Sequence, residues 1–265
     1  MKLFRSALLF PVLCCALSAC NAISPDINPA EAQANQQITA EYNIELGLAY
    51  LKQGQTARAK AQLLSALQER PDWSTALDAM AYYHEQTGDV TSARNDYLKA
   101  IAANPHAAGP QNNYGTFLCR QGDYRDSLTH FDNALQDKNY LNTAKVNENA
   151  GLCAMKIPDK ARAMQYFEKA LAENAHLRQS LLALASIQLD IGKTQQAEKT
   201  YKQFKLISEP TGESVYLSYR IAKKAGNAKR TKQMASLLKK QFKGTPAYQQ
   251  YLASQQAVKK MKKKS

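Results

Sequence analysis

The feature that most constrains the fold of this 265-residue chain is a period of 34 residues between turn-forming residues. The intervals are 34, 34, 36, 34 and 34 residues, between Gly54, Gly88, Gly122, Pro158, Gly192 and Gly226. A fixed period of this length is typical of a repeat protein built from helix–turn–helix units. We therefore expect six units, with Asn142 and Thr143 as a small insertion, over residues 40–73, 74–107, 108–141, 144–177, 178–211 and 212–245.

Residue size within the units supports this alignment. The eighth position is small in five units and departs only at Tyr219, the others being Gly47, Ala81, Gly115, Gly151 and Ala185. The twentieth position is small in the same five units, and the twenty-fourth is bulky: Leu63, Tyr97, Phe131, Phe167 and Tyr201. Such agreement argues against a generic helical protein. It predicts an all-α fold, a right-handed superhelix of six tetratricopeptide repeats whose first helices line a concave groove.

The N-terminus has the pattern of an export signal. Lys2 and Arg5 precede an apolar run over residues 7–16, which is too short to span a bilayer. Leu17-Ser18-Ala19-Cys20 matches the bacterial lipobox, in which the cysteine is lipidated and becomes the first mature residue. We expect residues 1–19 to be a signal peptide and Cys20 to carry diacylglyceryl and N-acyl chains. The alternative is an ordinary cleaved signal that happens to contain a cysteine.

The residues after Cys20 predict where the protein is retained. Asn21 stands where inner-membrane lipoproteins of enteric-type bacteria carry aspartate, which favours the outer membrane, with the protein facing the periplasm. Residues 20–39 include Pro25, Pro29 and several Asn and Gln, a composition that predicts a flexible tether.

The net charge of +13 is concentrated at the C-terminal end. Residues 214–265 contain 14 Lys and Arg and no acidic residue, whereas residues 20–213 contain 19 basic and 22 acidic residues. A nucleic-acid-binding fold would carry a distributed basic face instead, so we expect no nucleic-acid partner. Residues 246–265 predict a C-terminal helix and a basic tail. We expect contact with anionic membrane or cell-wall groups from Lys259, Lys260, Lys262, Lys263 and Lys264.

Motifs of catalysis and metal binding are missing from the sequence. Its four histidines are scattered, and none pairs with cysteine or acid at metal-ligand spacing. The sequence contains no phosphate-binding glycine loop and no nucleophile elbow. We therefore expect a binding protein without cofactor, metal or small-molecule substrate, rather than an enzyme.

Two segments are more distinctive than the repeat itself. The third unit contains Asn112-Asn113-Tyr114-Gly115-Thr116-Phe117-Leu118-Cys119, and the fourth contains Glu148-Asn149-Ala150-Gly151-Leu152-Cys153. Together with the lipobox and six repeats, they resemble the type IV pilus biogenesis and stability lipoproteins, the PilF/PilW pilotin family. The resemblance covers about residues 40–250 and implies an outer-membrane lipoprotein that helps the pilus secretin reach the outer membrane and multimerise. A second hypothesis keeps the anchor and the groove but recruits peptidoglycan or outer-membrane assembly enzymes.

Cys119 and Cys153 lie 34 residues apart on the expected first helices of neighbouring units. The insertion shifts their register by two places, so spacing alone leaves open both a bridge and two buried free thiols. The resemblance implies a disulfide, because this pair is bridged in the family.

Residues of units three and four are candidates for the peptide-binding groove. Asn113 and Asn149 take the sixth position of their first helices, which faces the groove in peptide-binding tetratricopeptide domains, and asparagine can donate and accept hydrogen bonds. The full candidate set is Asn112, Asn113, Thr116, Lys145, Glu148, Asn149 and Leu152. The cationic set of a carboxylate clamp is incomplete. Alternatively, the asparagines bond locally between helices. Ile44, Leu48 and Leu51 are candidates for an apolar floor, or for packing against neighbouring helices.

Overall fold

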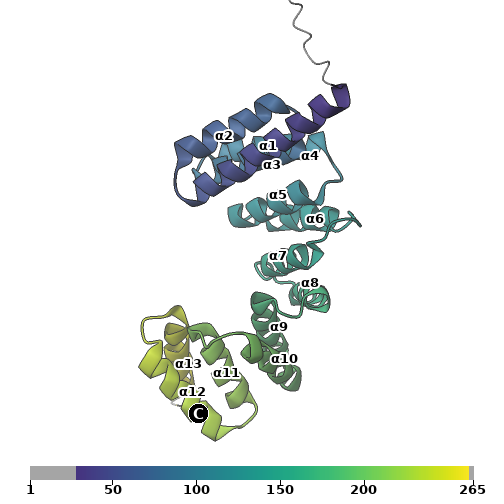
Figure 1. Cartoon of the computed structure of the whole chain (residues 1–265). Coiled ribbons are helices and arrows are strands. Elements are labelled where there is room, and N and C mark those ends of the chain that lie inside the picture. The colour runs from purple at the N-terminus through teal and green to yellow at the C-terminus, as the bar shows by residue number, and fades with distance from the viewer. Residues whose placement is uncertain (1–27, 263–265) are drawn as a thin grey trace, which may run out of the picture.

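The computed structural model describes residues 28–262, and the side chains of residues 28–256. This part of the chain contains helices and no strand. Six helix pairs stack in chain order and a further helix follows the last pair, which confirms the predicted all-α repeat superhelix (Figure 1). The helices are α1 Pro29–Lys52, α2 Thr56–Glu69, α3 Ser74–Gln86, α4 Val90–Ala103, α5 Ala108–Gln121, α6 Tyr124–Ala134, α7 Thr143–Ala154, α8 Lys160–Glu173, α9 Arg178–Asp190, α10 Thr194–Ile207, α11 Gly212–Lys224, α12 Ala228–Gln241 and α13 Pro246–Lys262.

Helix α1 begins at Pro29, well before the expected start of the first unit at residue 40. The expected tether is therefore wrong for residues 29–39. Pro29 stands in the first helical turn, where proline is favoured, and the Asn28 side chain caps the helix by accepting a hydrogen bond from Ala30 N at 3.1 Å. The alanines and glutamines that follow are good helix formers. The expected signal peptide, Cys20 and the first part of the tether lie outside the described residues.

In the first five pairs, a small residue on the first helix stands opposite a bulky residue on the second. A Cβ atom placed on Gly151 would lie 2.7 Å from the ring of Phe167, and one on Gly47 would lie 2.8 Å from Leu63. Both distances are too short for a methyl group, so glycine is required if the two helices are to cross this closely. The rings of Phe131 and Phe167 are fully buried in the layer between the helices. The size pattern in the sequence therefore corresponds to real contacts.

The turns between paired helices account for the period. Gly122 ends α5 with φ +93°, a left-handed conformation that glycine adopts without steric cost. In the fourth unit Pro158 occupies the corresponding turn between α7 and α8.

The last unit departs from the pattern because α13 packs against it. Tyr219 stands where other units have Gly or Ala, and its ring lies edge-on to that of Tyr251 on α13, with centroids 5.1 Å apart. The Tyr219 hydroxyl also accepts a hydrogen bond from Gln255 Nε2 at 2.6 Å. The large residue at the eighth position thus joins the sixth unit to the helix that covers the end of the stack.

The described helices include none with both the length and the apolar character needed to cross a bilayer. Of the tail lysines, Lys259, Lys260 and Lys262 continue α13, and their side chains are outside the description. Lys263 and Lys264 lie beyond the described residues.

Candidate peptide-binding groove

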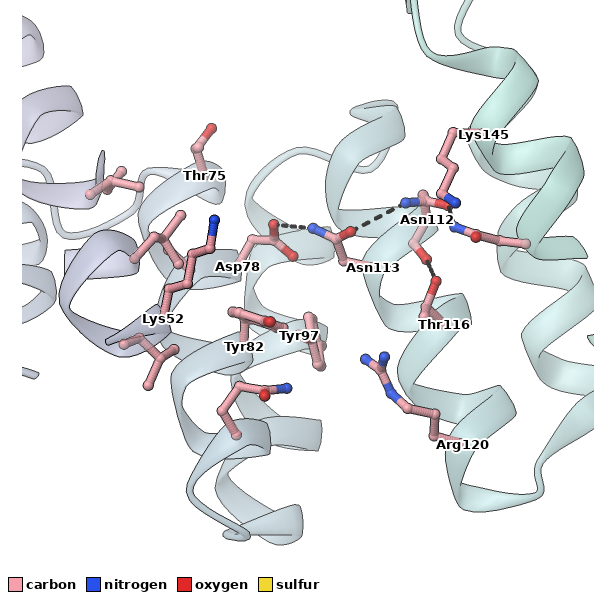
Figure 2. Close-up of a pocket in the computed structure, with 16 residues that line it drawn as sticks. Lys52, Thr75, Asp78, Tyr82, Tyr97, Asn112, Asn113, Thr116, Arg120 and Lys145 are labelled. Atoms are coloured by element: carbon pink, nitrogen blue, oxygen red, sulfur yellow. Dashed lines mark hydrogen bonds between the residues drawn. The ribbon is translucent and has the colours of Figure 1, made fainter. Parts of the chain in front are cut away.

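A groove of about 840 Å³ runs along the concave side of the first four units, where their first helices lie next to one another (Figure 2). This volume is in the range of ordinary ligand sites. Its walls come from α1, α3, α5 and α7, with one residue from α4. They consist of Ile44, Leu48, Leu51, Lys52, Thr75, Asp78, Ala79, Tyr82, Gln86, Tyr97, Asn112, Asn113, Thr116, Arg120, Lys145 and Asn149.

The N-terminal end of the groove is apolar. Leu48 and Leu51 of α1 are partly buried against the core of the first two units, and Ile44 belongs to that core. Tyr82 of α3 remains 38% exposed, which is high for a large apolar side chain. The same α1 residues thus pack against their neighbours and line the groove, so the two interpretations of Ile44, Leu48 and Leu51 are compatible.

The other end of the groove is lined by a row of amides on α5 and α7. Asn149 Nδ2 donates to Asn112 Oδ1 at 3.1 Å, and Asn112 Nδ2 donates to Asn113 Oδ1 at 3.2 Å. Asn113 Nδ2 then donates to Asp78 Oδ2 on α3 at 2.7 Å (Figure 2). The asparagines therefore bond between helices, as the alternative interpretation expected, while they also line the groove.

Asp78 ends this row of amides and is the most unusual group in the groove. The residue is 9% exposed, and its Oδ1 atom has no hydrogen-bond partner among the described residues. Burial raises the pKa of its carboxyl to about 7, and the hydrogen bond from Asn113 lowers it only in part. Near neutral pH the groove therefore contains a carboxyl group that exchanges between its neutral and charged forms.

Two cations of the groove wall are already paired. Arg120 Nε lies 2.6 Å from Glu85 Oε1, and Glu85 Oε2 accepts a hydrogen bond from the Tyr97 hydroxyl at 2.9 Å. Lys145 Nζ lies 2.6 Å from Glu148 Oε2. These pairs reduce the attraction that Arg120 and Lys145 exert on an acidic ligand, which agrees with the incomplete carboxylate clamp in the sequence.

Five of the seven groove residues expected from the sequence line this groove: Asn112, Asn113, Thr116, Lys145 and Asn149. Glu148 does not. It is 3% exposed, and its Oε1 accepts hydrogen bonds from Ser180 N at 3.2 Å and Ser180 Oγ at 3.0 Å, so α9 covers it. Leu152 lies instead in a second cavity of about 420 Å³, with residues of α9 and α11 such as Leu182 and Tyr216.

Asp78 and Tyr82 belong to the second unit, outside the distinctive motifs of units three and four, and are not among the residues expected from the sequence. Both residues occupy repeat positions that line the groove in the third unit. Asp78 takes the fifth position of its unit, as Asn112 does, and Tyr82 takes the ninth, as Thr116 does. Projecting the groove positions of the third unit onto the second therefore identifies both residues, although the same projection onto the fourth unit fails at Glu148 and Leu152.

A disulfide joins the third and fourth units. Cys119 at the end of α5 is bonded to Cys153 near the end of α7, with Cα atoms 5.8 Å apart. Cys153 is fully buried in the core that α7 and α8 share with their neighbours. The bridge links the two units on either side of the insertion.

We expect non-reducing peptide mapping by mass spectrometry to find a linkage between Cys119 and Cys153. Replacing both cysteines with alanine should lower the free energy of unfolding by about 2–4 kcal/mol, because the bridge restricts the unfolded chain. Urea unfolding with and without reductant measures this loss, and the double variant should be insensitive to the reductant. Free thiols at both positions in the oxidised protein would contradict the bridge.

Among residues 28–262 the structure brings together no group of three His, Cys, Asp or Glu side chains suited to a metal ion.

Comparison with known proteins identifies the family. Tetratricopeptide repeat models match residues 44–113 and 118–177, and a further one matches residues 180–212. Type IV pilus assembly protein PilF of Pseudomonas aeruginosa is 30% identical over 249 residues, which cover 94% of this chain and 98% of that protein. The chain belongs to the PilF/PilW family of tetratricopeptide proteins.

Solved structures of the PilF/PilW family agree with this assignment. The structure of Pseudomonas aeruginosa PilF has a TM-score of 0.76 at 29% identity, covering 83% of this chain and 99% of that one. The structure of PilW, described as a widely conserved type IV pilus biogenesis factor, has a TM-score of 0.71 at 25% identity, covering 80% of this chain and 98% of that one. The whole PilF/PilW superhelix is thus present here.

Proposed function

We propose that this protein is a pilotin of type IV pilus biogenesis, a non-enzymatic lipoprotein scaffold that binds the pilus secretin subunit and promotes its localisation and multimerisation. The observation that carries the proposal is the match to PilF along 94% of the chain, together with a PilF-like and PilW-like superhelix. The groove supports a binding role, since it is open, part apolar and part amide-lined.

The secretin segment that suits this groove is an amphipathic helix. Such a helix places an apolar stripe in a groove through side chains three and four residues apart. The stripe would lie over Leu48, Leu51 and Tyr82, and polar groups of the segment would face Asn113 and Asn149. Thr116, Asn112 and Lys145 extend the polar wall.

The lipobox supports a place for this binding at the outer membrane, on its periplasmic side. Lipidated Cys20 would hold the scaffold on the membrane, and Asn21 favours the outer one. Acyl chains that carry a bound secretin subunit to one surface raise its local concentration there, and this favours ring assembly. The lysines at 259–264 would add contacts with anionic headgroups, worth about 1 kcal/mol each near the surface.

Affinity purification from detergent extracts of cross-linked cells tests the proposal. We expect the tagged protein to recover the secretin as its main specific partner, identified by mass spectrometry. Recovery of a peptidoglycan hydrolase or synthase, with the secretin at background level, would contradict the pilotin function and favour the second hypothesis.

A further inference from the structure

We propose that Asp78 is the specificity-determining group of the groove and that it pairs with one lysine or arginine side chain of the bound amphipathic segment. This inference deepens the proposed function and rests on it for the identity of the partner. It concerns the chemistry of one position in the ligand, which the family resemblance does not specify.

One carboxylate oxygen of Asp78 lacks a hydrogen-bond partner among the described residues. A buried acceptor without a partner is destabilising, and nearly all such groups in folded proteins are paired. Asp78 Oδ2 has its partner in Asn113, but Oδ1 has none among the described residues. Asp78 lines the groove but Oδ1 itself is buried, so a donor on the ligand reaches this atom once the carboxylate turns toward the groove.

The hydrogen bonds of the amide row all run in one direction. In each bond of the row Asn149, Asn112, Asn113 and Asp78, the amide nitrogen points toward Asp78. The row therefore ends in an acceptor. It occupies Oδ2 and leaves Oδ1 without a partner among the described residues.

The charges around Asp78 determine which ligand group suits it. No ion pair links Asp78 to a cation in the part of the chain that the structure describes, and burial raises the pKa of its carboxyl. The titratable and charged groups that share the groove with it are Tyr97, Lys52, Arg120 and Lys145, its hydrogen-bond partner is Asn113, and Tyr140 lies within range of its charge. Arg120 and Lys145 are paired with Glu85 and Glu148, and Lys52 makes no ion pair with Asp78 among the described residues, so a basic side chain of the ligand competes only with Lys52 for this carboxylate.

Asp78 lies near the middle of the groove. Figure 2 shows Asp78 between Lys52 of α1 on one side and Asn113 of α5 on the other. It lies where the apolar end of the groove meets the amide-lined end. A helix whose apolar stripe covers Leu48 and Tyr82 would therefore place its basic side chain directly after the stripe.

The protonation of Asp78 determines how the affinity for a basic ligand changes with pH. A lysine on the ligand binds the charged form of Asp78, so complex formation releases a proton when the pH is below the pKa of about 7. Affinity should then fall by about tenfold for each pH unit below 7 and stay level above it. A ligand carboxylate would bind the protonated form, and its affinity would fall as the pH rises.

The test uses the full-length protein, purified in detergent. The probes are synthetic helical peptides with one leucine stripe, in which a single lysine is moved through successive positions after the stripe. A matched peptide carries glutamine at all of them. Fluorescence polarisation measures each Kd at pH 6, 7 and 8 for the wild type, for Asp78→Asn and for Asp72→Asn, an exposed control with the same chemical change.

We expect one lysine register to bind the wild type about tenfold or more tightly than the glutamine peptide at pH 8. Asp78→Asn should lose this advantage, and Asp72→Asn should keep it. Carbon-13 NMR of the free wild type should show the Asp78 carboxyl titrating near pH 7. A titration midpoint at the ordinary value for aspartate would mean that a cation of the protein itself already pairs with Asp78. Equal binding of lysine and glutamine peptides, or tighter binding on acidification, would overturn the inference.

Failure of the inference and failure of the proposed function give different results. If purification does not recover the secretin while the lysine register still depends on Asp78, the pilotin function is wrong and the recognition chemistry holds. If the secretin is recovered but no lysine register is preferred, the function holds and Asp78 has no role in specificity.

Discussion

The Phe167→Ala variant is expected to lose about 3–5 kcal/mol of the free energy of unfolding. The ring is fully buried, and it fills the layer between α7 and α8 against Gly151. The hydrophobic cluster around Phe167 includes Val146 of α7 and Ile187 of α9. The ring therefore stabilises the fourth unit and also its junction with the fifth. In a repeat protein, stability is transmitted through such junctions, and a cavity here weakens the stack in its middle.

Urea unfolding followed by far-UV circular dichroism measures this loss. Tyr42→Ala is the matched control, because it also removes an aromatic ring from a helix but at a side chain that is 62% exposed. We expect the control to change stability by less than about 0.5 kcal/mol. A loss below about 1 kcal/mol for Phe167→Ala would show that the contact between the eighth and twenty-fourth positions does not hold the unit together.

The Cys20→Ser variant is expected to move the protein from the membrane fraction to the soluble periplasmic fraction and to leave the secretin largely monomeric. Each buried CH₂ group of an acyl chain contributes about 0.8 kcal/mol, and more than one chain is needed for stable anchoring. Cys14→Ser and Cys15→Ser are matched controls, since both cysteines precede the expected cleavage site and should have no effect. The basic tail should leave Cys20→Ser with only weak, salt-sensitive binding to anionic vesicles.

Cell fractionation and heat-resistant secretin multimers on gels provide the two readouts. Normal secretin multimers in the Cys20→Ser strain would contradict the sorting model even if the protein itself left the membrane. A membrane-bound Cys20→Ser protein would instead favour the ordinary cleaved signal and another mode of attachment.

The repeat architecture was predictable because it depends on residue size at fixed positions. Gly47 with Leu63 and Gly151 with Phe167 form the predicted contacts, since one size rule applies in the first five units. The start of α1 was not predictable by the same rule. Pro29 and the asparagines before it are typical of both a loop and a helix start, and only the cap at Asn28 decides between them.

The candidate groove was predictable in part. Asn112 and Glu148 take the same position in their units, yet Asn112 lines the groove and Glu148 is covered by α9. Thr116 and Leu152 also share a position and lie in different cavities. The twist of the superhelix divides the concave side, and this division depends on how units stack rather than on the sequence of any one unit.

The central claim is that the groove, and not another face of the superhelix, binds the secretin. The most direct measurement is secretin recovery in the affinity purification from cells carrying Tyr82→Asp or Leu98→Asp. Both replace an exposed apolar residue of the second unit, Tyr82 at 38% and Leu98 at 46% exposure, but only Tyr82 lines the groove. Tyr82→Asp is expected to lose the secretin, and Leu98→Asp is expected to retain it. Equal recovery with both variants would contradict the claim.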